Sequence, residues 1–326
     1  MRRIIVLVSL FFVSSVCSWA QFHAIDNPTG VIMDSDLNVW ATSFTDNTVV
    51  KYQGNGSGGL TGAGQFGTGA VQLGVFGVGS NPTRLACDCS ILAPSSKTIW
   101  VTNFSSNNVT KLDMETGTRL GTFSVGAGPR GLAIDQTSVW VANSLSNTVT
   151  QLNKQTGLLI GTYPVGAAPY DVASDGANIW VANRNSNTVM KLSGGSSGPA
   201  GTMLSITSVA AQPQALLWDG TNIWVTSYSG NAVSKLQGST GAVLNATAIS
   251  AGPIAMADDG CSLWVSSYAS SRLTQVNLTT AAVVAVFAQP TVLPNPYGIV
   301  VHSCASPIIT TSYTGNEIGA FILVTN

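Results

Sequence analysis

Charged side chains are scarce in this chain, and their scarcity excludes whole classes of function. Lys and Arg together number 13, Asp and Glu number 14, and charged residues make up 8% of the 326 residues. A nucleic-acid binder needs clustered basic side chains that displace counterions from phosphates, and no such cluster occurs. The chain is also 45% hydrophobic, which excludes an intrinsically disordered protein. We therefore expect a folded protein that has no nucleic-acid partner.

Histidine and glutamate, which carry much of enzymatic acid–base chemistry, are nearly absent. The histidines are His23 and His302, and the glutamates are Glu115 and Glu317. No Ser-His-Asp set with usable spacing, phosphate-binding glycine loop or zinc motif occurs. General acid–base catalysis needs titratable groups gathered in one pocket. The sequence therefore favours a non-enzymatic protein, with no catalytic residue, metal site or cofactor assigned.

Long apolar runs are confined to the first residues. Arg2 and Arg3 precede an apolar run over residues 4–13, and small residues follow up to Ala20. This pattern is typical of a secretory signal peptide, with cleavage expected after Ala20. The run is too short to anchor the chain across a bilayer. We expect a secreted or periplasmic monomer without membrane insertion, in which residues 21–326 form one domain.

The chain is rich instead in a repeat of about 40 residues, each copy centred on a tryptophan. A typical copy reads Ile99-Trp-Val-Thr-Asn103, with an aliphatic residue nine positions after the tryptophan and a proline upstream. The six tryptophans are Trp40, Trp100, Trp140, Trp180, Trp224 and Trp264. A seventh copy has Ile309 in the tryptophan position. Repeats of this length with strand-forming residues are typical of β-propeller blades. The sequence predicts an all-β, seven-bladed propeller of four-stranded antiparallel blades, with the tryptophans as its structural core.

The third copy shows the expected strands, which cover residues 131–135, 139–143, 148–152 and 158–165. The last copy has no residues left for a fourth strand, whereas residues 22–25 precede the first proline, where such a strand should stand. We therefore expect the N-terminal strand to complete the last blade and close the ring, which would remove an open edge. A glycine-rich loop over residues 54–69 is inserted in blade one.

The segment Trp100-Val-Thr-Asn103, followed by Asn108-Val-Thr-Lys-Leu-Asp113, resembles the YVTN-type (YncE-like) bacterial propeller repeat. The resemblance covers the mature chain and implies an exported propeller of a kind often thought to bind proteins or surface components. The repeats more distantly resemble virginiamycin B lyase and NHL-like propellers. That resemblance would imply a Glu-x-His pair acting with magnesium, but neither Glu115 nor Glu317 is followed two residues later by histidine.

Four cysteines lie beyond the signal peptide, namely Cys87, Cys89, Cys261 and Cys304. Disulfides are allowed in an exported protein. Cys261 and Cys304 each stand eight residues after the proline of adjacent repeats, so a bridge between them is one expectation. Metal binding by Cys87 and Cys89 is the minor alternative, and the pairing of all four stays open.

Superimposing the repeats predicts a binding surface. The loops before each first strand and the turns after each second strand lie at one end of a propeller and surround the channel mouth. This end would carry a crown of Arg130, Tyr170, Arg184, Tyr228, Tyr268, Tyr297 and Tyr313. Aromatic and arginine side chains are enriched at binding hot spots, and a concave mouth is the default ligand site. The alternative is that these aromatics only fill the blade junctions.

An aspartate recurs at the end of the first strand in six repeats, at Asp34, Asp88, Asp135, Asp175, Asp219 and Asp259. We expect these residues to form turns.

The leading hypothesis is a secreted, non-enzymatic binding or scaffold propeller that presents the crown to an unknown protein, peptide or glycan. The alternatives are a propeller-type lyase or lactonase with a divalent cation in its channel, and a structural module of the cell envelope.

Overall fold

A computed structural model of the chain describes residues 28–53, 71–88, 97–195, 198–288 and 295–301, and the backbone alone of 15–21, 308–312 and 317–325. Every regular element in these ranges is a β-strand. No helix in them is long and apolar enough to cross a membrane.

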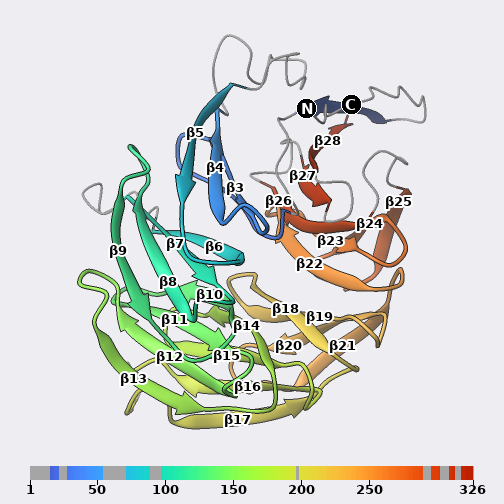
Figure 1. Cartoon of the computed structure of the whole chain (residues 1–326). Helices are drawn as coiled ribbons and strands as arrows, with labels where there is room; N and C mark the ends of the chain where they lie inside the picture. The colour runs from blue at the N-terminus through green and yellow to red at the C-terminus, as the bar shows by residue number, and fades with distance from the viewer. Residues whose placement is uncertain are drawn as a thin grey trace.

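Six four-stranded antiparallel blades follow one another along the chain, each built from four consecutive strands (Figure 1). Blade one contains β2 (Val31–Met33), β3 (Val39–Ser43), β4 (Thr48–Tyr52) and β5 (Gln72–Gly77), and blade two β6 (Pro82–Asp88), β7 (Thr98–Asn103), β8 (Asn108–Asp113) and β9 (Arg119–Ser124). Blade three contains β10 (Pro129–Ile134), β11 (Ser138–Asn143), β12 (Thr148–Asn153) and β13 (Leu159–Pro164). Blade four contains β14 (Pro169–Ser174), β15 (Asn178–Asn183), β16 (Thr188–Ser193) and β17 (Met203–Ser208). Blade five contains β18 (Pro213–Trp218), β19 (Asn222–Ser227), β20 (Ala232–Gln237) and β21 (Val243–Ala248), and blade six β22 (Pro253–Asp258), β23 (Ser262–Ser267), β24 (Arg272–Asn277) and β25 (Val283–Ala288).

The expectation of seven blades is wrong: the structure has six blades of the predicted kind and one composite sheet. That sheet joins β26 (Pro296–Val300), β27 (Ile308–Ser312) and β28 (Glu317–Thr325) to β1 (Ser15–Gln21) from the other end of the chain. Its innermost strand β26 contacts both β22 and β2, which places the sheet between blades six and one.

The closing strand is also not the predicted one. β1 pairs with β28 from Ser15 opposite Thr325 to Gln21 opposite Gly319, and Figure 1 shows the two ends of the chain side by side. Six of the seven residues of β1 thus belong to the predicted signal peptide, and residues 22–25 lie outside the described residues. β1 covers the outer edge of β28 along residues 319–325, whereas β27 pairs with residues 317–321 only, so β1 is the strand that pairs the far end of β28.

The core lies between neighbouring blades. Trp40 of blade one is fully buried and packs with Ile99 and Val101 of blade two, and Trp100 of blade two packs in the same way with Val139 and Val141 of blade three. A buried tryptophan removes about 150–250 Å² from water, a stabilisation of roughly 4–6 kcal/mol as an upper estimate.

Five of the six recurring aspartates form turns, as predicted, and also accept a hydrogen bond from the tryptophan of their own blade. In blade three, Oδ1 of Asp135 accepts backbone N–H bonds from Thr137 and Ser138, while its Oδ2 accepts the indole N–H of Trp140 at 2.7 Å. The same indole bond, at 2.7–2.9 Å, joins Trp40 to Asp34, Trp180 to Asp175, Trp224 to Asp219 and Trp264 to Asp259. Blade two departs from the pattern, because Asp88 bonds Lys154 instead.

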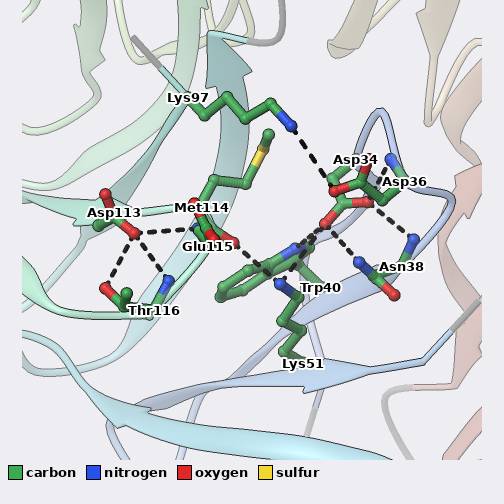
Figure 2. Close-up of polar contacts among 10 residues, drawn as sticks. All are labelled: Asp34, Asp36, Asn38, Trp40, Lys51, Lys97, Asp113, Met114, Glu115 and Thr116. Atoms are coloured by element: carbon green, nitrogen blue, oxygen red, sulfur yellow. Dashed lines mark hydrogen bonds and ion pairs between the residues drawn. The ribbon is translucent and has the colours of Figure 1, made fainter. Parts of the chain in front are cut away.

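A lysine on the third strand of four blades reaches across to the next blade. Figure 2 shows Lys51 between the Asp34 carboxylate and the carbonyl of Met114, the first residue after β8. Its ammonium lies 4.8 Å from the ring centroid of Trp40. The equivalent bonds run from Lys111 to the carbonyl of Lys154, from Lys191 to that of Gly238 and from Lys235 to that of Leu278. We call this arrangement the lysine staple.

Candidate functional site

The backbone at the channel mouth is built to present side chains. In five blades and in the composite sheet, the register between the first and second strands shifts just after the proline that recurs in each repeat, as it does after Pro129 and Pro169. A bulge of this kind leaves an extra residue outside the ladder and re-aims its side chain. Arg130 and Tyr170 occupy that position and are partly exposed.

Not every residue at this position faces the mouth. Thr29 and Thr83 are buried, and their hydroxyls donate to the carbonyls of Pro82 and Pro129 in the next blade. Gln214 and Ile254 are buried as well. In four repeats the residue after the proline therefore fills a blade junction, as the alternative interpretation expected. In the other three, Arg130, Tyr170 and Tyr297 are partly exposed.

Two tyrosines meet across the ring. The hydroxyls of Tyr170 on β14 and Tyr297 on β26 are 3.1 Å apart. Their sheets are not neighbours, since blades five and six separate them on one side and blades one to three on the other. Tyr268 packs edge-on against Tyr297 with ring centroids 6.2 Å apart. The bonded pair of Tyr170 and Tyr297, which we call the bar, spans the channel mouth. Three residues of the predicted crown, Tyr170, Tyr268 and Tyr297, are thereby brought together.

Two arginines flank the bar. The guanidinium of Arg130 lies 4.4 Å from the ring centroid of Phe104 and 4.6 Å from that of Tyr170, and it donates to the Tyr170 hydroxyl at 3.3 Å. Arg184 lies 5.7 Å from the Tyr170 centroid and donates to Gln212 Oε1 at 3.0 Å. Within the described ranges neither arginine has a carboxylate partner.

The second residue after the proline forms an ion pair between two blades, which was not predicted from the sequence. Arg84 of blade two and Asp171 of blade four approach to 3.8 Å between Nη2 and Oδ2. Asp171 also accepts the backbone N–H of Leu216 at 3.0 Å. Gly131 of the intervening blade makes room for the carboxylate, because a Cβ there would lie 2.3 Å from Asp171 Oδ1.

A sequence signal for this pair exists. Two residues after the proline, the other repeats have only glycine or alanine: Gly30, Gly131, Ala215, Ala255 and Gly298. The two exceptions, Arg84 and Asp171, carry opposite charges. Superimposing this register as well would have singled out both.

Burial dominates the electrostatics of the site. Removal from water raises the pKa of Asp171, and the nearby Arg84 and the backbone N–H bonds oppose that rise only in part. Burial likewise raises the pKa of Tyr297 far above its usual range, assisted by Tyr170 and opposed by Arg130 and Arg84. Tyr297 is therefore a neutral hydrogen-bonding phenol at physiological pH, and Asp171 holds a proton more tightly than an exposed aspartate does.

The remaining predicted residues are less informative. Tyr228 is partly exposed near Gly252, and Tyr313, His23 and His302 lie outside the described residues. Cys87 and Cys261 are each disulfide-bonded, which removes Cys87 as a thiolate metal ligand, while Cys89 and Cys304 lie outside the described ranges. No group of three or more potential ligands that could hold a metal ion occurs among the residues described.

Comparison with known proteins identifies the fold as a β-propeller. No family model and no curated protein matches the sequence. A solved streptogramin B lyase superimposes with a TM-score of 0.75 at 16% identity, covering 95% of this chain and 98% of that one. A catalytically inactive virginiamycin B lyase from Staphylococcus aureus with quinupristin gives 0.76 at 15%, covering 95% and 100%. The hydrazine synthase of Kuenenia stuttgartiensis gives 0.72 at 15%, covering 93% and 96%. At these identities the likeness defines a β-propeller similar to virginiamycin B lyase in fold alone.

Proposed function

We propose that this chain is a binding propeller whose ligand presents a carboxylate or similar planar anion to Arg130 and Arg184 at the channel mouth. The observation that carries the proposal is the state of these two arginines. Both lie beside the Tyr170 ring, and neither has an acidic partner in the part of the chain that the structure describes. The other mouth arginine, Arg84, is already paired with Asp171.

The chemistry of the mouth suits such a ligand. The guanidinium of Arg130 is planar, and its contacts with the Phe104 and Tyr170 rings restrict the orientation of that plane. A planar guanidinium of fixed orientation matches the two oxygens of a carboxylate. The hydroxyls of Tyr170 and Tyr297 add hydrogen-bonding groups. The ligand classes we consider are acidic segments of proteins, peptides and glycans of the cell surface, in keeping with the export expected from the first 20 residues.

The test is an array of acidic and neutral peptides and glycans probed with the purified chain. In the double variant Arg130→Met, Arg184→Met, the hits should bind at least about 30-fold more weakly, as loss of a charge-assisted pair of about 2 kcal/mol predicts. Arg119→Met, an exposed outer-strand arginine, is the matched control. Undiminished binding by the double variant, or equal binding to neutral and acidic probes, contradicts the proposal.

A second candidate function is lyase activity on a cyclic depsipeptide. It is favoured by the full-length likeness to streptogramin B lyases and by Asp171, whose raised pKa suits proton donation in the channel. The Glu-x-His pair of the lyase resemblance is absent from the sequence. Incubation with quinupristin and magnesium, followed by mass spectrometry, tests this candidate. A ring-opened product that is lost in Asp171→Asn supports it, and unchanged quinupristin excludes it.

A further inference from the structure

The lysine staple is missing from blades three and six, which carry Gln151 and Gln275 at the lysine position, and a cavity lies at the junction that follows blade three. Blade three has Gln151 where blades one, two, four and five have lysine. At the junction of blades three and four, a cavity of about 380 Å³ is lined by Asp135, Ser138, Gln151, Gly194 and Gly195, among others. It lies at the end of the ring opposite the crown, since its walls come from the turns after the first and third strands.

The cavity retains the acceptors of a staple. In every staple the lysine donates to the carbonyl of the first residue after the third strand of the next blade, as Lys111 does to Lys154. In blade four that residue is Gly194, which lines the cavity. Its backbone keeps the register of the other blades, because its N–H bonds the carbonyl of Ala177 just as that of Lys154 bonds Thr137.

The cavity also retains the negative charge. Two of the four staple lysines form an ion pair with the aspartate of their own blade, with Lys51 3.9 Å from Asp34 and Lys191 3.7 Å from Asp175. Asp135 is the equivalent residue at the cavity, and it forms no ion pair with any residue that the structure describes. Gln151 does not replace the lysine, because it bonds Ser138 and Tyr163 within its own blade.

A local insertion gives this junction its room. In blade three the turn after the third strand is closed by a bond from the Gly157 N–H to the carbonyl of Asn153, four residues earlier. In blade four the same bond runs from Gly201 to Ser193, eight residues earlier. The longer turn contributes Gly194, Gly195 and Ala200 to the cavity wall.

We propose that the junction of blades three and four binds a primary alkylammonium group, which takes the place that a lysine ammonium takes in the four stapled blades. The ligand ammonium donates to the carbonyls of Gly194 and Gly195 and is balanced by Asp135. Its alkyl chain leaves through the open side of the cavity. This proposal is independent of the crown and its ligand.

The experiment uses n-butylammonium chloride, which matches a lysine side chain, and n-butanol as its neutral counterpart. Binding to the full chain is followed by saturation-transfer NMR titration, and we expect a dissociation constant on the order of millimolar for so small a ligand. Gln151→Lys should rebuild the internal staple and weaken n-butylammonium binding at least about 10-fold. Gln275→Lys, the same change in blade six, should leave binding unaltered.

Each other outcome overturns the proposal. Equal binding of n-butanol would mean an apolar cavity without ammonium recognition, and unaltered binding to Gln151→Lys would place the ligand elsewhere. Absence of saturable n-butylammonium binding to the unsubstituted chain would mean that the cavity does not bind an alkylammonium group. Folding of Gln151→Lys is checked by its circular dichroism and melting temperature, which should not fall, because lysine occupies this position in four blades.

Discussion

The indole–carboxylate bond of the blades can be measured with a matched pair of substitutions, Trp40→Phe and Trp100→Phe. Both indoles are fully buried, each lies 5.5 Å from a phenylalanine ring, and each has a lysine ammonium about 5 Å from its centroid. They differ in one respect. Trp40 donates to Asp34 at 2.9 Å, whereas Trp100 Nε1 has no acceptor in the described part of the chain.

The magnitudes follow from that difference. Trp40→Phe loses a hydrogen bond to a charged group, about 1.5–3 kcal/mol, and leaves a cavity of part of a ring, which adds about 1 kcal/mol. Trp100→Phe leaves a similar cavity but removes a buried unpaired N–H, whose desolvation costs about 1–3 kcal/mol. We expect a loss of about 3 kcal/mol in the free energy of unfolding for Trp40→Phe, and of less than about 1 kcal/mol for Trp100→Phe.

Urea unfolding followed by far-ultraviolet circular dichroism measures both values, provided that the slope of the transition is unchanged between variants. The double variant should show additive losses, because the two indoles lie in different blade junctions. If the two single variants lose equal stability, the indole bond contributes nothing beyond packing, and the reasoning is refuted.

Three further predictions follow from the contacts of single side chains. The folded state raises the pKa of Asp171, so protonation of this residue stabilises the fold below the unfolded pKa of about 3.9, and that stabilisation is lost as pH rises through the folded pKa. The melting temperature of Asp171→Asn relative to the unsubstituted chain should therefore rise between pH 4 and pH 7. A difference that stays constant with pH would contradict this. Lys191→Met should lower the free energy of unfolding, measured with urea, by about 1–3 kcal/mol, because it removes a buried donor to the Gly238 carbonyl. Lys97→Met, at an exposed ion pair with Asp36, should lower it by less than about 0.5 kcal/mol. Equal losses in the two variants would refute the distinction. Peptide mapping without reductant should recover Cys261 linked to Cys304, with reduction lowering stability by about 2–4 kcal/mol, and a link from Cys261 to any other cysteine would reject that pairing.

The strands were predictable because turn residues mark their ends. Asn147 and Gly157 both have positive φ, at 57° and 75°, and residues of these types tolerate that backbone with little strain. The strand expected over residues 148–152 is accordingly found as β12, Thr148–Asn153. The recurring aspartates were recognised as turn residues for the same reason, but their bond to the indole needs the two side chains in space.

The mouth was predictable only in part, because it depends on how strands from distant blades converge. The register after the proline singled out Arg130, Tyr170 and Tyr297, and the structure brings these three together. It could not separate them from Thr29 or Ile254, which the same register buries. Arg84 and Asp171 were missed because only the first residue after the proline was superimposed, and their pairing spans two blades.

The predicted signal peptide and the strand that closes the ring share residues 15–20. Cleavage after Ala20, as the leader pattern predicts, would remove residues 15–20 and with them nearly all of β1. The backbone of β28 would then lose the partner that runs from Ser15 to Gln21. In a chain that starts at Gln21, we expect the outward-facing amides of β28 to exchange hydrogen faster than in the full chain, while those of β25, already an outer strand, exchange at the same rate. Hydrogen exchange with mass spectrometry compares the two chains directly. Equal protection of β28 in both would show that β1 contributes nothing to closure, and the composite sheet would then hold the ring with three strands.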